Sequence, residues 1–424
     1  MHCRTVLSCL LAVVALLATT APASASTATD TRAARSLAVR DLPDAAPRPA
    51  VEVASGTART TADCAAVRAD PAAYAAGGAR QVSCWSVSKL APRDVAVQAW
   101  CDSAGANTWW VNRLEACIHG ISLVYTVVQV PTGTVLGTAT FAVSHEIELS
   151  ATSLELDDNA AVTLVASSGV LASPIASFSA SCSAPCDTDD GSGFTLETFT
   201  RGETEDAFFT YSDTPSNSAD LFETHYTFTV QPPPNTLPVD PVAEWSTPTD
   251  LFRCDDLVSA NDGCVIPFFT PELQVSVATH RAAAIGILFA QDYLPDGWGY
   301  TTELTRLADN AAAEANRRRI CQDGTWVPEP FVRDDSCDEY AFARSRQSGG
   351  QLGLTGADCA EIIPWFDETD GQWYIDPIRY TGTERCSRAH VPLDENSLVG
   401  SALGVLTSQM RLLDHDKYWV GVYA

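Results

Sequence analysis

Two short segments near the C-terminal end of the chain place carboxylate, histidine and amide side chains at close spacing. The first, residues 334–340, reads DDSCDEY and contains Asp338; the second, residues 390–397, reads HVPLDENS and contains His390 and Asn396. A hard divalent cation such as Mg²⁺ needs only one or two carboxylate or carbonyl oxygens and several waters. A general base needs a carboxylate or a histidine within hydrogen-bond reach of the water that it activates. The two segments therefore carry the residue types that metal-assisted hydrolysis requires.

The same segments also have a purely structural interpretation. Acidic pairs are common on the solvated faces of acidic proteins, and Asp394 to Ser397 could simply cap the first turn of a helix. His390 could be an alternative base, a hydrogen-bond donor to a phosphate, or a structural residue, which is the commoner role of a lone histidine. No G-x-S-x-G elbow, P-loop or dinucleotide-binding fingerprint occurs in the sequence, which disfavours a serine hydrolase and a nucleotide-binding enzyme.

The composition limits the class of protein. The chain has 424 residues, 46% of them apolar, and 26 Lys and Arg residues against 53 Asp and Glu residues, so the formal net charge is −27. The length suggests two or three domains, and the apolar content excludes a wholly disordered or collagen-like chain. The acidity argues against a nucleic-acid coat protein and against binding to an anionic membrane. It leaves room for an enzyme that acts on nucleic acid through a local basic cleft.

The first residues have the pattern of a secretory signal peptide. Arg4 supplies the positive charge, Val6 to Ala18 are mostly apolar, and Ala23 to Ala25 form an A-x-A cleavage site. No later stretch reaches the roughly 18 uninterrupted apolar residues of a membrane span. We therefore expect residues 1–25 to be removed and the mature protein to be soluble, secreted and extracellular, with no membrane partner.

The cysteines predict a disulfide framework. The chain has 14 cysteines, of which Cys3 and Cys9 leave with the signal peptide. The remaining even number in an exported chain allows up to six bridges, because disulfides persist in oxidising compartments. A zinc site is the alternative, but no histidine or second close cysteine pair completes a tetrahedral ligand set. Local pairing is favoured, and the pairs expected on this ground are Cys182–Cys186, Cys254–Cys264 and Cys101–Cys117.

The chain divides by composition and periodicity into four parts after the signal peptide. Residues 26–60 are rich in Ala, Thr, Arg and Pro and predict a flexible leader. Short alternating runs between turn signals predict that residues 61–230 form a disulfide-containing, all-β antiparallel sandwich-like accessory domain. The segment 231–244 contains QPPPNTLPVDP and predicts a Pro-rich linker. Residues 245–424 predict an α+β domain, with helices expected over 279–290, 301–319 and 398–413 and strands over 373–380 and 418–423.

Two sequence blocks in the last part resemble a known family. Residues 337–343 read CDEYAFA and resemble the C-D-E-[YFW]-P-F-A signature of secreted deoxyribonucleases of the NucA/NucB family. Residues 385–397 read RCSRAHVPLDENS and resemble the second family block, a V-P-x-x-[DE]-N-x segment that enters a helix. The resemblance covers roughly residues 320–424. Ala341 stands where the family has proline, a departure that we expect to alter a turn and not the chemistry.

The resemblance implies a ββα-metal (His-Me finger-like) nuclease core in which an aspartate takes the place of the usual general-base histidine. On the matching positions, Asp338 is the candidate base, and Asn396 is the residue that orients or ligates a divalent Mg²⁺ or Mn²⁺ ion. Glu339 and Glu395 are the neighbours that could ligate the metal directly or through water. The metal would stabilise the leaving oxygen and the charge that develops on the phosphorus group.

The remaining expected site residues would act on the substrate. Arg385 and Arg388 lie close to the second block and could hold the scissile or an adjacent phosphate, and His390 remains the alternative base. Because residues 251–424 are acidic in balance, DNA binding should be weak and sensitive to salt.

These features together predict a secreted, metal-dependent endodeoxyribonuclease that hydrolyses extracellular DNA with little sequence specificity. The alternative is a disulfide-stabilised extracellular binding or surface protein whose nuclease-like domain is degenerate. A secreted toxin with a nuclease warhead is a third possibility, although no specialised delivery segment is apparent. The architecture alone suggests cell wall or carbohydrate as the ligand of the accessory β domain.

Overall fold

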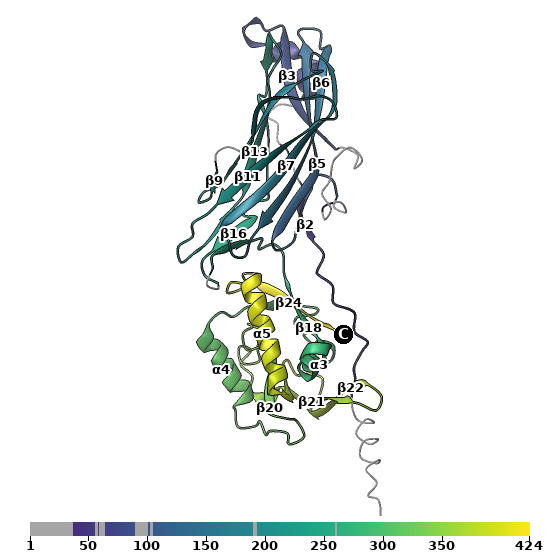
Figure 1. Ribbon diagram of the computed structural model, residues 1–424, viewed down its shortest axis with the longest axis vertical. Coiled ribbons are helices and arrows are strands. Elements are labelled where there is room, and N and C mark those ends of the chain that lie inside the picture. Colours follow the sequence, from purple (N-terminus) through teal and green to yellow (C-terminus); the bar gives the residue numbers. More distant parts are fainter. Residues whose placement is uncertain are drawn as a thin grey trace, which may run out of the picture.

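Among its described residues, the computed structural model contains two large hydrophobic cores that follow one another along the chain, and two smaller hydrophobic clusters. It describes residues 37–55, 58, 64–89, 101, 105–189, 193–258 and 261–424, so the predicted signal peptide lies outside the described residues. The first core ends at Phe269 and the second begins at Leu273. We call residues 51–269 the β region and residues 271–424 the C-terminal region. They form the upper and lower parts of the molecule in Figure 1.

The β region is built almost entirely from strands. Among its described residues, the one α-helix is α2 (Cys64–Ala69), with short 3₁₀ turns at Pro71–Tyr74 and Ala76–Gly78. Its strands are β2 (Val51–Ser55), β3 (Gln81–Lys89), β4 (Thr108–Val111), β5 (Glu115–Gln129), β6 (Val135–Leu149), β7 (Glu155–Gly169), β8 (Ile175–Cys182), β9 (Asp187–Thr188), β10 (Phe194–Thr198), β11 (Thr204–Ser212), β12 (Ala219–Phe222), β13 (Thr224–Val230), β14 (Thr236–Pro238), β15 (Val242–Ser246), β16 (Phe252–Asp255) and β17 (Gly263–Val265).

Two sheets of the β region pack face to face around an aromatic core. The larger sheet has the order β14-β3-β5-β6-β7-β11-β9, with β4 attached to β5 and β2 attached to β4, and the smaller has the order β10-β8-β13-β15. Side chains alternate between buried and more exposed along β13, as expected for a strand with one face on a core. Phe141 of the large sheet lies with its ring centroid 4.9 Å from that of Phe228 in the small sheet. The predicted β-rich, multidomain class is therefore confirmed.

The segment expected to be a linker belongs to these sheets instead. Within residues 231–244, β14 pairs in parallel with β3, and the first residues of β15 pair with β13. The Trp245 indole N–H, just beyond this segment, donates a hydrogen bond to Nε2 of buried His145 at 3.0 Å. Prolines are compatible with strands at sheet edges, which is where β14 and β15 lie. Proline content alone therefore misplaced the boundary, which falls between Phe269 and Leu273.

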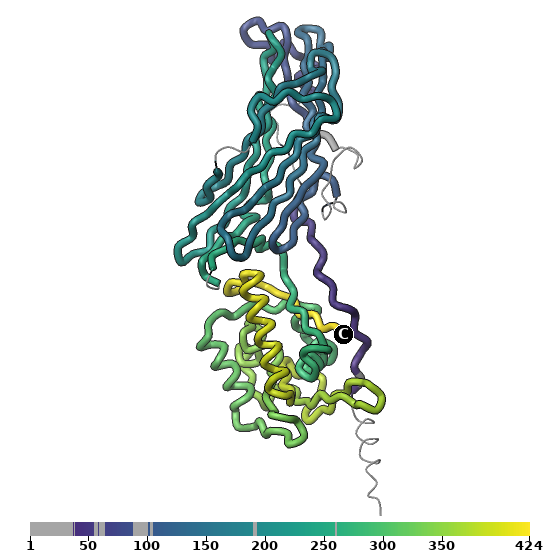
Figure 2. Tube along the Cα trace, in the orientation of Figure 1, coloured from purple at the N-terminus to yellow at the C-terminus, as the bar shows by residue number. Residues whose placement is uncertain are grey.

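Part of the expected flexible leader is also structured. Strand β1 (Leu37–Ala38) pairs antiparallel with a strand of the C-terminal region, and β2 pairs with β4 of the β region. Between them, Leu42 packs against the C-terminal core, and Pro43 O accepts a hydrogen bond from the Ala424 N–H at 3.1 Å. The described residues 37–55 therefore run along both parts of the molecule (Figure 2).

The disulfides follow the local pairing predicted from the sequence. All three expected pairs, Cys182–Cys186, Cys254–Cys264 and Cys101–Cys117, are present. The remaining cysteines form three more bridges, Cys64–Cys84, Cys321–Cys337 and Cys359–Cys386. Each bridge joins two cysteines of the same region, so the two hydrophobic cores are not linked to each other by these disulfides.

The C-terminal region is a mixed sheet covered by helices. Its further strands are β18 (Glu272–Ser276), β19 (Leu304–Thr305), β20 (Asp335–Tyr340), β21 (Ala360–Asp367), β22 (Gln372–Arg379), β23 (Ser387–Pro392) and β24 (Lys417–Tyr423), and its helices are α3 (Val277–Tyr293), α4 (Asn310–Cys321) and α5 (Leu393–Gln409). The main sheet has the order β1-β22-β21-β23-β20, and β18, β24 and β19 form a second, small sheet.

Helix α3 covers one face of the main sheet. It begins after Ser276, whose Oγ accepts a hydrogen bond from the Ala278 N–H at 3.1 Å. Its Gly286 faces β23 so closely that an added Cβ atom would lie 3.0 Å from Cβ of Ala389. The absence of a side chain at Gly286 therefore lets α3 approach the strand that precedes α5. Within the described part of the chain, no helix is long and apolar enough to cross a membrane.

Buried charged groups join the two regions at the C-terminal end of α5. Arg411 is fully buried and forms two hydrogen bonds with the carboxylate of Asp255, at 2.6 and 3.0 Å. Arg113 and Arg253 of the β region both bond Asp416, and both also donate to the backbone oxygen of Arg411. These guanidinium groups satisfy carbonyls at the helix end, where intrahelical donors are lacking. Helix α5 therefore runs from the main sheet to this joint with the β region (Figure 2).

Candidate functional site

The candidate site lies at edge strand β20, whose side chains alternate between two faces. Ser336 contacts α5, and Tyr340 lies in the C-terminal core beneath α3, so Asp338 between them shares that face. Cys337 and Glu339 point to the opposite face, where Cys337 is bonded to the end of α4. Strand β20 pairs antiparallel with β23, which leads directly into α5.

Asp338 is a buried carboxyl group, and no opposite charge compensates it within the part of the chain that the structure describes. Its residue is 8% exposed, and it lies opposite Ala389 in the pairing of β20 with β23. Burial raises the pKa of Asp338 to about 7, because the charged form loses its hydration. Close to neutral pH the group can therefore both hold and release a proton.

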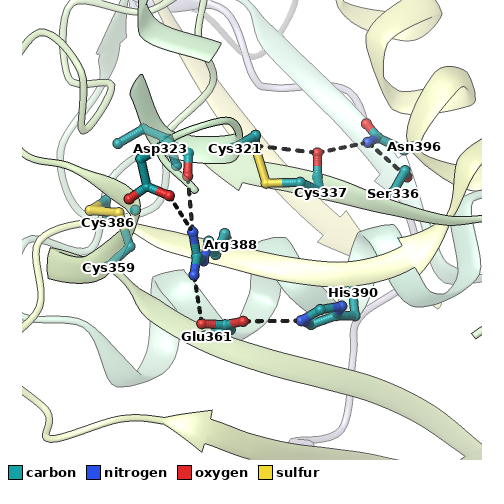
Figure 3. Close-up of a disulfide and its surroundings, with 12 residues drawn as sticks. Cys321, Asp323, Ser336, Cys337, Cys359, Glu361, Cys386, Arg388, His390 and Asn396 are labelled. Atoms are coloured by element: carbon teal, nitrogen blue, oxygen red, sulfur yellow. Dashed lines mark hydrogen bonds and ion pairs between the residues drawn. A yellow bond between two sulfur atoms is a disulfide. The ribbon is translucent and has the colours of Figure 1, made fainter. Parts of the chain in front are cut away.

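Asn396 connects the first turn of α5 to β20. Its Nδ2 donates hydrogen bonds to Ser336 Oγ and to the backbone oxygen of Cys337, both at 3.2 Å (Figure 3). Because α5 begins at Leu393, Asn396 lies inside the first turn and is not the residue that caps it. The structure thus brings Asn396 to the strand that carries Asp338, and to the same face of that strand as Ser336.

Glu395 precedes Asn396 and faces the beginning of α3. Its Oε2 accepts a hydrogen bond from the Ala282 N–H at 2.8 Å, and its Oε1 lies 3.4 Å from Nε of Arg281. Burial raises the pKa of Glu395, although the Ala282 N–H and the Arg281 guanidinium favour the charged form. Both carboxylate oxygens of Glu395 are therefore engaged by α3.

Glu339 lies on the opposite face of β20 from Asp338. Neither of its buried carboxylate oxygens has a hydrogen-bond partner within the described part of the chain. Burial raises the pKa of Glu339 to about 8, and the Arg317 guanidinium of α4 opposes that rise. Because of the strand pleat, Glu339 and Glu395 approach the sheet from different sides. The arrangement does not favour the expectation that they act on one metal ion together.

His390 is the centre of a buried polar network on the face that carries Glu339. Its Nδ1 lies 2.7 Å from Asp335 Oδ2. Its Nε2 lies 3.2 Å from Glu361 Oε1 (Figure 3). The Trp326 ring stacks on the imidazole at a centroid distance of 3.8 Å. With both ring nitrogens occupied and the residue 1% exposed, His390 has the surroundings of a structural histidine rather than of an alternative base.

The two expected phosphate-binding arginines are held by other parts of the protein. Arg388 is fully buried and donates to Glu361 Oε2 at 2.8 Å (Figure 3). It also donates to the backbone oxygens of Ile320 and Thr325. Arg385 is half exposed but forms an ion pair with Asp296 at 2.7 Å. These positions do not support a phosphate contact by Arg388, and Arg385 would have to leave its partner first.

Several residues that shape the site were not identified from the sequence. Trp326 stacks on His390, Glu361 joins His390 to Arg388, and Arg281 contacts Glu395. Asp335 did lie in the first acidic segment but had no assigned role. The other three lack a local motif, because each reaches the site through packing between elements that are distant in sequence.

Replacing His390 by phenylalanine tests its structural role. The ring can still stack on Trp326, but Asp335 and Glu361 each lose a buried hydrogen-bond partner. We expect the free energy of unfolding to fall by about 1–3 kcal/mol, measured by urea denaturation. His225→Phe, at a half-exposed histidine of the β region, is the matched control and should change stability by less than about 0.5 kcal/mol. Equal stability of the two variants would contradict a structural role of His390.

The residues on the α5 side of β20 fit the donor preference of a hard cation. Within the described residues, no group of three or more His, Cys, Asp or Glu side chains could hold a metal ion. A Mg²⁺ site needs only one or two carboxylates, with waters completing the octahedron. Asp338 is a buried carboxyl for which no charged partner is found among the described residues, and the amide oxygen of Asn396 adds an oxygen donor from the first turn of α5. Glu395 could add a third oxygen donor, but it would first have to release Ala282 or Arg281. These residues therefore suit Mg²⁺ or Mn²⁺ in donor type.

Comparisons with known proteins add little to this geometry. No protein family matches the chain, and no curated protein matches it either. Among solved structures, the native conformation of alpha-2-macroglobulin from E. coli, determined by cryo-EM, is similar over 33% of this chain at 10% sequence identity. The match spans 9% of that protein, with a TM-score of 0.19, and carries no conclusion about fold or function.

Proposed function

We propose that this protein is a secreted, metal-dependent endodeoxyribonuclease with its active site at β20 and the first turn of α5. The observation that carries the proposal is the buried Asp338, with its pKa raised to about 7, on the strand that Asn396 ties to α5. The sequence resemblance to NucA/NucB deoxyribonucleases adds support. So does the antiparallel pairing of β20 with β23, which leads directly into α5 and suits a ββα-metal core, although β21 and β22 lie between β20 and β23 in the chain. The six disulfides suit an oxidising, extracellular environment.

In the proposed reaction Asp338 accepts a proton from the attacking water. The water oxygen then bonds to phosphorus, the bond from phosphorus to the leaving sugar oxygen breaks, and that oxygen takes up a proton from solvent. A base with a pKa near the working pH is well matched to this transfer. Asn396 fixes the distance between β20 and α5, and so holds Asp338 and Glu395 on one side of the sheet. A bound divalent ion would supply charge stabilisation to the phosphoryl group.

A plasmid-nicking assay on the oxidised, signal-free protein tests this function. Supercoiled plasmid should be converted to relaxed and then linear forms with Mg²⁺ or Mn²⁺, and EDTA should prevent the conversion. If well-folded protein leaves the plasmid supercoiled with every divalent ion tried, the alternative of an extracellular binding protein with a degenerate nuclease domain replaces the proposal. Pull-down on cell-wall and polysaccharide material would then test the β region as the binding module.

A further inference from the structure

Arg281 interrupts helix α3 beside the candidate site. Its backbone has φ 45° and ψ −119°, a conformation that glycine adopts readily and that an L-residue with a side chain rarely does. The helix resumes at Ala282, whose N–H donates a hydrogen bond to Glu395 Oε2 in the first turn of α5. Strained backbone conformations of this kind are concentrated at functional sites, where the surrounding structure maintains them. The break therefore makes Arg281 a candidate functional residue.

The Arg281 side chain extends from this break over the rim of the site. It is 55% exposed, with Nε 3.4 Å from Glu395 Oε1. The guanidinium carbon lies 5.7 Å from the centroid of the Trp373 ring on β22, which provides a cation–π contact. Phe366 of β21 packs beside Trp373, with ring centroids 5.2 Å apart. An exposed cation is thus held between an aromatic surface and a proposed metal-binding carboxylate.

Three other arginines near the site form ion pairs or hydrogen bonds with residues outside it. Arg388 is buried among carboxylate and carbonyl oxygens, and Arg385 is paired with Asp296. Arg333 donates twice to Asp394, at 2.8 and 3.0 Å. Arg281 differs from these three because its carboxylate partner belongs to the site itself. If a divalent cation were bound by both Glu395 and a substrate phosphate, that phosphate would lie beside the Arg281 guanidinium.

From this arrangement, and resting on the proposed nuclease function, we infer that Arg281 is the residue that contacts the substrate phosphate next to the scissile bond. The planar guanidinium can donate two parallel hydrogen bonds to phosphate oxygens. The Trp373 ring restricts the side chain to the rim of the site, so less conformational entropy is lost on binding. Arg281 thus takes the role that the sequence had suggested for Arg385 and Arg388.

The test is binding of a fluorescein-labelled DNA duplex to the full signal-free protein in EDTA, followed by fluorescence anisotropy over a series of salt concentrations. Arg281→Gly removes the cation and suits the positive φ, so its melting temperature should equal or exceed that of the wild type. Arg281→Lys keeps the charge without the planar fork. Arg318→Ala is the matched control, because Arg318 is similarly exposed and pairs with Glu314 on α4. The kcat/KM for plasmid cleavage in Mg²⁺ is measured on the same proteins.

We expect Arg281→Gly to bind DNA about tenfold more weakly, the loss that follows from removing one charge-assisted contact. The slope of log affinity against log salt concentration should become less negative by about 0.9, which is the contribution of one neutralised phosphate. Arg281→Lys should keep most of that slope, and Arg318→Ala should match the wild type. If the wild type cuts plasmid but Arg281→Gly binds and cuts equally well, the inference is overturned and the nuclease proposal stands. If the wild type neither binds nor cuts DNA, the proposed function fails, and this inference fails with it.

Discussion

Replacing Asp338 by asparagine is expected to abolish DNA cleavage while making the protein more stable at neutral pH. Asparagine has the same shape but cannot accept the proton of the attacking water, and loss of a general base costs about 10²–10⁴-fold in rate. No opposite charge among the described residues compensates the buried carboxylate, so the neutral asparagine also removes the free-energy cost of burying a charge. Cleavage is measured by plasmid nicking in Mg²⁺, and stability by thermal unfolding.

The pH dependence follows from the direction of the pKa shift. In the folded protein Asp338 releases its proton near pH 7 instead of near its ordinary value of 3.8. The folded state therefore binds more protons than the unfolded state between these values, and stability from this group declines as pH rises toward 7. In Asp338→Asn this contribution to the decline should disappear, which corresponds to about 4 kcal/mol of unfolding free energy at pH 8. The kcat/KM of the wild type should rise with pH through about 7.

A surface carboxylate serves as the control for this variant. Asp367 lies at the end of β21, where hydrogen bonds from Thr369 lower its pKa, so it is already ionised at neutral pH. Asp367→Asn should leave cleavage and its pH profile unchanged. If Asp338→Asn cleaves DNA as well as the wild type, Asp338 is not the general base. A variant that loses both cleavage and stability would instead show that Asp338 is needed for folding.

Replacing Arg411 by alanine is expected to cause the largest loss of stability among the substitutions considered. Arg411 and Asp255 are both fully buried, and Arg411 also donates to the backbone oxygens of Ala151 and Asn261 in the β region. Removing one partner of a buried ion pair costs about 3–5 kcal/mol, because the other charge is left without compensation. Urea denaturation followed by tryptophan fluorescence measures the change in the free energy of unfolding.

Two further variants separate the charge from the packing. Arg346→Ala removes an exposed ion pair with Asp414 and should cost less than about 1 kcal/mol. The double variant Arg411→Met, Asp255→Asn removes both buried charges and should recover part of the stability lost in Arg411→Ala. A cost for Arg411→Ala as small as that for Arg346→Ala would show that the joint between the two regions does not depend on this buried pair.

The candidate site could be predicted only where its residues lie in one continuous pattern. The segment containing Asp338 and the segment containing Asn396 were recognisable from their sequences, and the structure brings the two together through β20 and α5. The expected partnership of Glu339 with Glu395 was not supported, because the alternation of a strand turns Asp338 and Glu339 to opposite faces. Which face meets α5 depends on how the strand packs, and neither residue type indicates it.

The sequence by itself determined the features that depend on neighbouring residues. Alternating side chains predicted the β region, and cysteines separated by 4, 10 and 16 residues formed the expected bridges because short loops are easily closed. The helix expected over 301–319 was correct for its later part, since Asp309 caps α4 by accepting hydrogen bonds from the Ala311 and Ala312 N–H groups. Local propensity and capping carry this information.

Only the tertiary structure decided which charged residues are buried and which face the site. Arg113 bonds Asp416 across 303 residues, and Glu395 accepts from Ala282 across 113 residues. Arg388, which resembled a phosphate ligand in sequence, lies inside the C-terminal region, whereas Arg281 extends to its surface. Periodicity shows that a residue belongs to a strand or a helix, but the choice of partner depends on how distant elements pack against one another. That choice placed the candidate site at the beginning of α5 and the joint with the β region at its end.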